Sequence, residues 1–219
     1  MGSGGVPPFE DRLAHGGFFP ALVATWQAAC FRPTEFFETV GNSEDLGSAL
    51  VFGVLIGWVS LLVVTLWQML IPVSLLPGLP GDAALPRLGA GALSLACVAA
   101  LGWLYPLISI FVAGLIVHLF LLIFGGANRG LIVTLRVVAY AVAPTILAVI
   151  PVIGGCIATL WSLVIEIIGL AAAHRTETWR ALLAVFGPVI LCLCVTLLFG
   201  TAFLAALGLA IQQAGTIRP

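Results

Sequence analysis

The chain has 219 residues, of which 62% are hydrophobic and 8% are charged, whereas an ordinary soluble domain has about 25% charged residues. These values exclude a soluble globular protein. The net charge of −1 does not favour a nucleic-acid partner, so we expect an all-α polytopic membrane protein surrounded by the lipid bilayer.

The first predicted element is a short helix over residues 18–31. Its apolar residues recur at three- and four-residue steps with Thr25 off that stripe, a pattern typical of an amphipathic helix. The segment is too short to cross a bilayer, which takes about 20 residues. Two placements remain open for it. One is the membrane interface, with Phe18, Phe19 and Trp26 as aromatic anchors, and the other is the side of the membrane bundle.

A second short helix is predicted after Pro33, which resets the backbone. Phe36 and Phe37 are expected to anchor this helix at the interface. A polar turn over residues 41–47 follows it. We therefore expect residues 1–47 to form a cytoplasmic N-terminal segment ahead of the first membrane span.

Five apolar spans are predicted next, forming a five-helix transmembrane bundle over residues 48–211, with 212–219 as a short extracytoplasmic tail. The second apolar run begins near residue 89, so we expect a short lead-in over 89–98 and a span that bends at Pro106. The spans cover residues 48–71, 99–124, 131–150, 152–173 and 181–211.

The arginines predict the orientation, because cytoplasmic loops carry an excess of basic residues. With five spans and a cytoplasmic N-terminus, Arg87 and Arg218 are expected outside. The other six arginines are expected on the cytoplasmic side: Arg12, Arg32, Arg129, Arg136, Arg175 and Arg180.

Three ionisable residues lie within the spans at a similar depth. Counted from the cytoplasmic ends of their spans, His118, Arg136 and Glu166 are roughly 8 to 10 Å deep at helical rise. A charged group in a bilayer costs about 2.5–3.5 kcal/mol and is expected to pair. We predict that Glu166 contacts Arg136 or His118, and that Tyr140 donates to the same cluster.

Small residues predict where the helices pack. A stripe of small and polar side chains runs along the fourth span through Glu166, and Gly53 and Gly57 give the first span small-xxx-small spacing. The other members of the stripe are Gly155, Thr159, Ser162, Gly169 and Ala173. His174 is expected to be a charge at the C-terminal end of its helix, favoured by the helix dipole. The five cysteines lack metal-ligand spacing and are expected to be buried small apolar side chains.

Two interpretations of the polar cluster are open. An intramembrane carboxylate near a histidine suits proton or ion transport, whereas a single buried ion pair suits a tight helix interface that fixes register. We favour the interface, because a transporter of this size normally carries more than one polar residue per crossing. The sequence has no Gly-x-Ser-x-Gly, His-Glu-x-x-His or phosphate-loop motif, so we expect neither an enzyme, a cofactor nor a metal site.

Several motifs from residue 120 onward together resemble the Yip family, the Ypt/Rab-interacting five-span membrane proteins. The segment from Arg32 to Phe37 is also similar to the one before the first span in bacterial members. The motifs are Gly125-Gly126, Leu135-Arg-Val-Val-Ala-Tyr140, Pro144, Ile150-Pro-Val-Ile-Gly154, Trp161-Ser-Leu-Val164, Ile167-Ile-Gly-Leu170 and His174. The resemblance implies an all-helical five-span bundle with a cytoplasmic N-terminus.

In eukaryotes such proteins are associated with Golgi and ER membranes, small GTPases and vesicle trafficking. This chain lacks a long hydrophilic N-terminal domain, so we do not expect a small GTPase among its partners. All its basic residues are arginine, which we read as the bias of a GC-rich genome. That bias favours a bacterial inner membrane, whereas a eukaryotic source would place the protein in the Golgi or ER.

The leading functional hypothesis is a non-enzymatic membrane scaffold or adaptor that organises other membrane proteins, copies of itself or local bilayer shape. The first alternative is a small transporter, channel or lipid-moving protein that uses His118, Arg136 and Glu166. The second is an accessory subunit of a larger membrane complex, which differs from the scaffold in having one stable stoichiometric partner.

Overall fold

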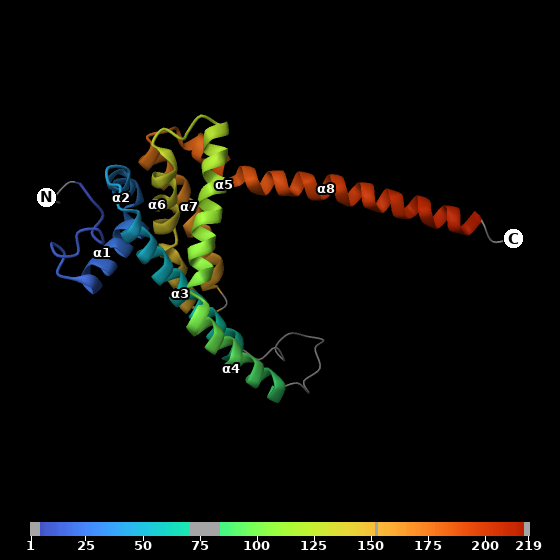
Figure 1. Ribbon diagram of the computed structural model, residues 1–219, viewed down its shortest axis with the longest axis horizontal. Coiled ribbons are helices and arrows are strands. Elements are labelled where there is room, and N and C mark those ends of the chain that lie inside the picture. The colour runs from blue at the N-terminus through green and yellow to red at the C-terminus, as the bar shows by residue number, and fades with distance from the viewer. Residues whose placement is uncertain (1–4, 71–83, 152, 217–219) are drawn as a thin grey trace.

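The computed structural model describes residues 5–70, 84–151 and 153–216 (Figure 1). Every regular element within these residues is a helix, which confirms the predicted fold class. In chain order they are α1 Phe18–Phe31, α2 Pro33–Gly41, α3 Leu46–Leu70, α4 Ala84–Leu101, α5 Leu104–Ile123, α6 Gly130–Ala141, the 3-10 helix η3 Ala143–Val149, α7 Gly154–His174 and α8 Thr178–Thr216.

Five apolar stretches of the described residues are long enough to cross a membrane, so the predicted polytopic architecture is confirmed. Their mean hydropathies lie between 2.0 and 2.8. The third stretch combines α6 with η3, and the fifth is the first part of α8. They are Leu46–Leu70, Leu104–Ile123, Gly130–Val149, Gly154–His174 and Thr178–Phe199.

Helix α6 forms the centre of the bundle. Every residue from Val133 to Ala141 is buried, and the span containing α6 is 67% buried, against 33% or less for the other four. Helices α3, α5 and α7 pack around it, and α2 contacts it beside α7 (Figure 1). This central position explains why α6 is apolar on nearly all sides apart from a few polar residues that contact other elements.

Three glycines that the sequence assigns to packing lie where helices approach closely. A methyl group added at Gly53 of α3 would lie 2.6 Å from the Ala139 carbonyl oxygen of α6. One added at Gly57 would lie 2.7 Å from Pro106 of α5, and one added at Gly169 of α7 would lie 2.9 Å from a side chain of α6. These distances leave no room for a side chain, so close packing at these points needs glycine.

The predicted small-residue stripe on α7 is not a packing face along its whole length. A methyl group added at Gly155 would meet no atom within 4 Å, and Thr159 is exposed. The Thr159 hydroxyl donates to the Gly155 carbonyl oxygen of its own helix at 2.8 Å. Helix α2 packs its Phe37 ring against Gly169, so the packed part of the stripe is the half that leads to His174.

Two prolines, Pro106 and Pro144, each follow a break in helical geometry. Helices α4 and α5 separate at 102–103, three to four residues before Pro106, and do not bend at Pro106 as predicted. The predicted lead-in over 89–98 is the longer helix α4. Helix α6 likewise changes to 3-10 geometry after Ala141, ahead of Pro144. Proline cannot donate to the carbonyl four residues earlier and its ring clashes with that carbonyl, so the break precedes it.

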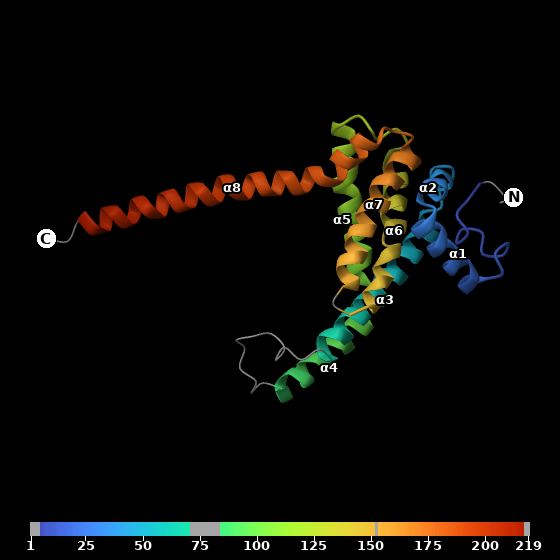
Figure 2. The same ribbon diagram turned by 180° about the vertical axis from the view of Figure 1, so that it is seen from behind.

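Helices α4 and α8 extend away from the bundle (Figures 1 and 2). Helix α4 runs antiparallel to the outer half of α3, where Trp58 Nε1 donates to the Val98 carbonyl oxygen at 2.8 Å. Helix α8 packs against α5 near Gly187 and then leaves the bundle. Every side chain from 189 to 199 is exposed. The fifth span therefore joins the bundle only through its first part, whereas the sequence predicts a complete five-helix bundle.

Helix α1 is packed against the bundle, which is the second of its two predicted placements. Trp26 Nε1 donates to the Ala143 carbonyl oxygen at 3.0 Å, and Trp161 Nε1 donates to the Cys30 carbonyl oxygen at 3.2 Å. Phe18 and Phe19, by contrast, are 37% and 74% exposed. The helix therefore docks through Trp26 and its C-terminal end, while its first turn faces outward.

Phe36 and Phe37 are core residues, and their predicted role as interface anchors is wrong. They are 4% and 0% exposed, and the Phe36 ring packs edge-to-face against Tyr140 with centroids 5.1 Å apart. Glu35 and Glu38 lie on the opposite, exposed face of α2. Helix α2 is thus amphipathic with its aromatic face turned toward the bundle.

Four of the five cysteines are exposed, whereas the sequence predicts all five to be buried. Cys30 is buried, and burial raises the pKa of its thiol to about 12. The thiol therefore stays protonated at neutral pH. Cys97, Cys156, Cys192 and Cys194 are exposed on apolar helices, where small apolar side chains contact lipid as readily as protein.

The close approach of α3 to α6 gives a direct test of the packing. We expect Gly53→Ala to lower the free energy of unfolding by about 1–3 kcal/mol, because the new methyl group collides with a backbone carbonyl that cannot move freely. Thermal unfolding in mild detergent measures the change. Gly155→Ala is the matched control, since its methyl group meets no atom within 4 Å. Equal stability of the two variants would contradict the close contact.

Candidate functional site

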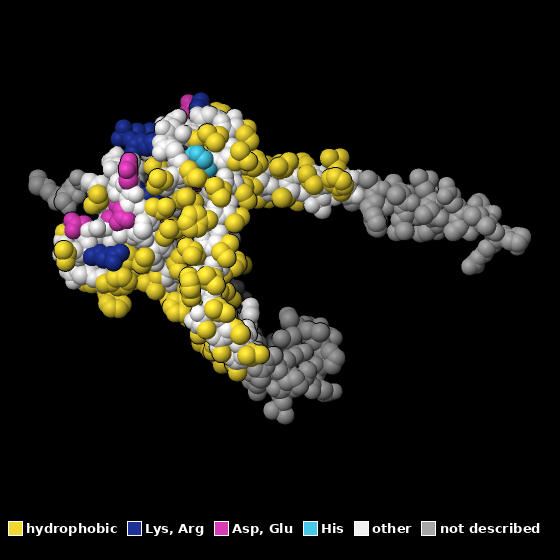
Figure 3. Space-filling model, viewed as in Figure 1, with side chains coloured by type: hydrophobic (Ala, Val, Ile, Leu, Met, Phe, Trp, Pro, Cys, Tyr) yellow, Lys and Arg dark blue, Asp and Glu magenta, His cyan; other side chains and the backbone are white. Residues whose placement is uncertain are grey.

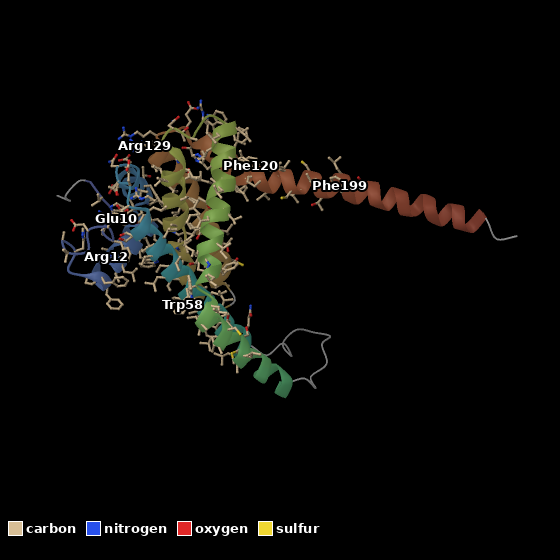
Figure 4. All side chains as sticks on the ribbon, in the orientation of Figure 1. Glu10, Arg12, Trp58, Phe120, Arg129 and Phe199 are labelled. Carbon is tan, nitrogen blue, oxygen red and sulfur yellow. The ribbon has the colours of Figure 1, made fainter. Side chains whose placement is uncertain are left out.

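Glu10 of the N-terminal segment, labelled in Figure 4, forms a buried ion pair with Arg136 of α6. The two side chains are 3% and 0% exposed. Tyr140 Oη donates to Glu10 Oε1 at 2.9 Å, and Ser43 Oγ donates to Oε2. Arg136 Nη1 donates to the carbonyl oxygens of Val40 and Ser43. This Glu10–Arg136 cluster therefore joins the N-terminal segment, the α2–α3 turn and α6.

Phe9 holds Glu10 in place by inserting its ring into the bundle. Phe9 is 0% exposed, and its ring lies edge-on to Phe18 and Phe52 at centroid distances of 5.2 and 5.8 Å. Its backbone N–H donates to Thr25 Oγ1 at 2.8 Å. The Arg12 guanidinium lies over the ring, 4.3 Å from its centroid. These contacts fix the carboxylate although no helix or strand surrounds Glu10.

The Glu10–Arg136 cluster pairs its own charges, and in the described part of the chain only Arg136 Nε of its side-chain N and O atoms is buried without a hydrogen-bond partner. Burying an isolated charge is very costly, whereas a buried pair with additional hydrogen bonds is tolerated. The Glu10 carboxylate receives donors from Arg136, Tyr140 and Ser43, and the guanidinium also binds two backbone carbonyls. A closed arrangement of this kind fixes the relative position of chain segments and leaves no free charge for a substrate.

A second polar cluster joins α5, α6 and α7 near the same end of the bundle. Thr134 Oγ1 lies 2.8 Å from His118 Nδ1 and 2.9 Å from His174 Nε2. The backbone N–H of Arg129 donates to His174 Nδ1 at 3.3 Å. Thr134 and His174 are fully buried, whereas His118 is half-buried. We call this the His118–Thr134–His174 cluster.

The hydrogen bonds of this cluster run in one direction. A backbone N–H can only donate, so His174 Nδ1 accepts and the neutral ring carries its hydrogen on Nε2. Nε2 therefore donates to Thr134 Oγ1. Among the hydrogen bonds of the described residues, His118 Nδ1 is the one acceptor within reach of the Thr134 hydroxyl, so this hydroxyl donates to His118 Nδ1. His174 is thus a neutral core residue, and the predicted charged helix end is wrong. Arg175 follows it with φ 50° and ψ 49° and caps α7.

Glu166 does not pair with Arg136 or His118, so the predicted pairing is wrong. Arg136 is bonded to Glu10, and His118 to Thr134. In the described part of the chain, Glu166 forms no hydrogen bond or ion pair. It is half-buried on α7, one turn from Ser162, whose Oγ is buried without a partner there. Similar depth does not bring side chains together when their helix faces point to different neighbours.

Sequence reasoning missed Glu10, Ser43 and Thr134. Glu10 and Ser43 belong to polar segments without periodicity, so no pattern predicts that they enter the core. Thr134 lies in a mostly apolar helix, where no sequence pattern distinguishes it from its neighbours. Within the residues that the structure describes, no group of three or more His, Cys, Asp or Glu side chains is placed to hold a metal ion.

A family model described as the Yip1 domain matches residues 26–199. The chain belongs to the Yip1 family. The matched region runs from α1 into α8 and contains Arg136 together with the whole His118–Thr134–His174 cluster. Glu10 lies outside it, so this Yip1-family protein neutralises its central arginine with a residue from beyond the matched region. No curated protein and no solved structure matches the chain.

Removing the Glu10 charge tests whether the ion pair holds the fold together. We expect Glu10→Gln to lower the free energy of unfolding of this Yip1-family protein by about 3–5 kcal/mol, because Arg136 would keep a buried charge without a counter-charge. Unfolding in mild detergent measures the loss. Combining Glu10→Gln with Arg136→Met should recover part of it, because no buried charge then remains.

Asp11→Asn provides the matched control for that experiment. Asp11 is the next residue in the chain but is exposed, so removing its charge should change the stability by less than about 0.5 kcal/mol. Equal losses in the Glu10 and Asp11 variants, or no recovery in the double variant, would show that the buried pair is not the cause.

Proposed function

We propose that this Yip1-family protein is a non-enzymatic scaffold that organises other membrane proteins, copies of itself or the local shape of the bilayer. The observation that carries the proposal is the free position of α8. Its apolar stretch beyond Pro188 lies clear of the bundle in both views (Figures 1 and 2). The side chains from Val189 to Phe199 are all exposed, so this stretch has its entire circumference available for another membrane helix.

The side-chain pattern of α8 suits helix association within a membrane. Cys192 and Thr196 are four residues apart and both exposed, so they form a line of small side chains on one face. Small residues at this spacing let two membrane helices approach closely. The surrounding surface consists of larger apolar side chains such as Leu193, Leu197 and Phe199. We propose that α8 packs there against a partner helix.

The state of the polar residues favours a scaffold over a transport path through the bundle. Arg136 is sealed by Glu10 and by backbone carbonyls. His174 and Thr134 are bonded to one another inside the core. Thr134 also lies 2.8 Å from His118 Nδ1, so Arg136 and His118, two of the three residues expected in a transport path, are engaged in contacts between helices. We further propose a bacterial inner membrane as the location, and we propose no small GTPase partner.

Crosslinking from α8 tests the scaffold. A photo-crosslinking residue at Val195 of α8, 43% exposed, should give a discrete product in intact membranes, whose mass and peptides identify a second copy or another membrane protein. The same residue at Leu119 of α5, 56% exposed, should give lipid adducts only. A single product of fixed stoichiometry would indicate the accessory-subunit version of the proposal. Lipid adducts alone at both positions would reject the scaffold.

Glu166 motivates a second candidate function, a small transporter, channel or lipid-moving protein, because its half-buried carboxylate has no partner among the described residues. The scaffold predicts that Glu166→Cys, in a chain otherwise free of cysteine, resists water-soluble thiol reagents in membranes. Ile165→Cys is the control for a fully buried neighbour. Rapid labelling at 166 but not at 165 would indicate a hydrated path and replace the scaffold with the transporter.

A further inference from the structure

The His118 ring presents a polar hydrogen outward from the bundle. Its Nδ1 accepts from Thr134, so the hydrogen of the neutral ring is on Nε2. In the described part of the chain, Nε2 has no hydrogen-bond partner. It is also not among the sealed atoms without a partner, which are Arg136 Nε, Ser162 Oγ and Arg180 Nε. The Nε2–H group therefore reaches the surface of the protein.

The surface around this donor is apolar and faces lipid. Phe111, Leu115 and Leu122 lie seven and three residues before His118 and four after it, so all four side chains share one face of α5. The three apolar residues are 37%, 52% and 57% exposed. Figure 3 shows histidine colouring at the surface beside the upper end of α5, with apolar side chains next to it.

His118 lies in the outer part of the hydrocarbon core, on the side of the lipid ester oxygens at the arginine-bearing end of the bundle. His118 lies five residues before Ile123, the last residue of α5, which is about 8 Å along the helix axis. The polar headgroup region adds several ångströms on each side of a hydrocarbon core about 30 Å thick. Helix α5 has 20 residues, which span about 30 Å at helical rise. A donor about 8 Å below its end therefore lies inside the hydrocarbon core, where an unpaired donor is costly and the ester oxygens at the edge of the core are the nearest lipid acceptors.

We propose that His118 binds a glycerophospholipid of the leaflet at the arginine-bearing end of the bundle, with Nε2–H donating to a lipid ester or phosphate oxygen. One acyl chain then lies along Leu115 and Phe111. The headgroup lies toward the α5–α6 turn, where Arg180 Nη1 donates to the Gly125 carbonyl oxygen. Thr134 is a positioning residue, because its hydroxyl fixes both the ring orientation and the location of the hydrogen. This site does not depend on the scaffold function.

Solid-state NMR tests the site on the full chain. The protein, with ¹⁵N-labelled histidine, is reconstituted in phosphatidylglycerol and phosphatidylethanolamine bilayers that carry ¹³C at the ester carbonyls. His118 is assigned as the signal lost in His118→Gln. We expect a dipolar contact from His118 Nε2 to the ester ¹³C or to the phosphate ³¹P, and these two arms distinguish the acceptor. Contact with water alone, or with a carbonyl of a second copy, would overturn the proposal.

Two threonine variants separate positioning from general stability. Thr134→Val removes the hydroxyl that orients His118, so the lipid contact should be lost, and Thr134→Ser should restore it. Thr65→Val is the matched control, because Thr65 is also buried but its hydroxyl donates to Leu61 of its own helix at 2.8 Å. If Thr134→Val fails to fold, the ¹⁵N spectrum of the wild-type protein still tests the proposal, because it shows which ring nitrogen of His118 carries the hydrogen. A hydrogen on Nδ1 in place of Nε2 would contradict the proposed lipid site.

Discussion

The Glu10–Arg136 ion pair is the interaction on which the arrangement at the arginine-bearing end depends. A guanidinium that is fully buried in the central helix demands a counter-charge and acceptors for its N–H groups. The protein supplies the charge from the N-terminal segment and the acceptors from the α2–α3 turn. Satisfying one side chain of α6 thereby fixes the position of two segments that are distant from it in the chain. Phe36 and Phe52 then pack against Tyr140, which donates to Glu10, and Phe9 packs against Phe52.

Two kinds of contact hold the bundle together. At the arginine-bearing end, side-chain hydrogen bonds link the helices through the Glu10–Arg136 cluster and the His118–Thr134–His174 cluster. Farther along, the helices meet at Gly53 and Gly57, through tryptophan N–H groups that bind backbone carbonyls, and through a hydrogen bond of 2.9 Å between the Ser60 and Thr145 hydroxyl groups. Polar networks in a low-dielectric environment specify unique partners, whereas glycine contacts set the distance between helices. Polar contacts therefore fix which segments meet, and glycine contacts such as that of Gly169 with α6 fix how closely the helices pack.

Sequence alone predicts the helices well because hydropathy and length are local properties. It also places Gly53, Gly57 and Gly169 at points that prove to be close contacts. Sequence alone fails where the contact depends on which neighbouring element a side chain points toward in the folded protein. Glu166 and Arg136 have similar depths, yet the guanidinium turns to the α2–α3 turn, and no periodicity marks Glu10 as its partner. Phe36 and Phe37 suit an interface as well as a core, so only the packing of α2 on α7 decides between them. The departure of α8 from the bundle likewise has no signal in its uniformly apolar sequence.

Glu10 precedes the residues that match the family, and its position affects where the boundary of the domain lies. The Yip1 domain match begins at residue 26, but the packed interior begins earlier, because Phe9 and the Glu10 side chain that neutralises Arg136 are buried and precede the match. The first residue of the family match therefore lies after the first residues of the packed interior. In this protein, the residues ahead of the recognisable domain are an integral part of its interior, and family membership by itself does not specify which residue provides the counter-ion for the central helix.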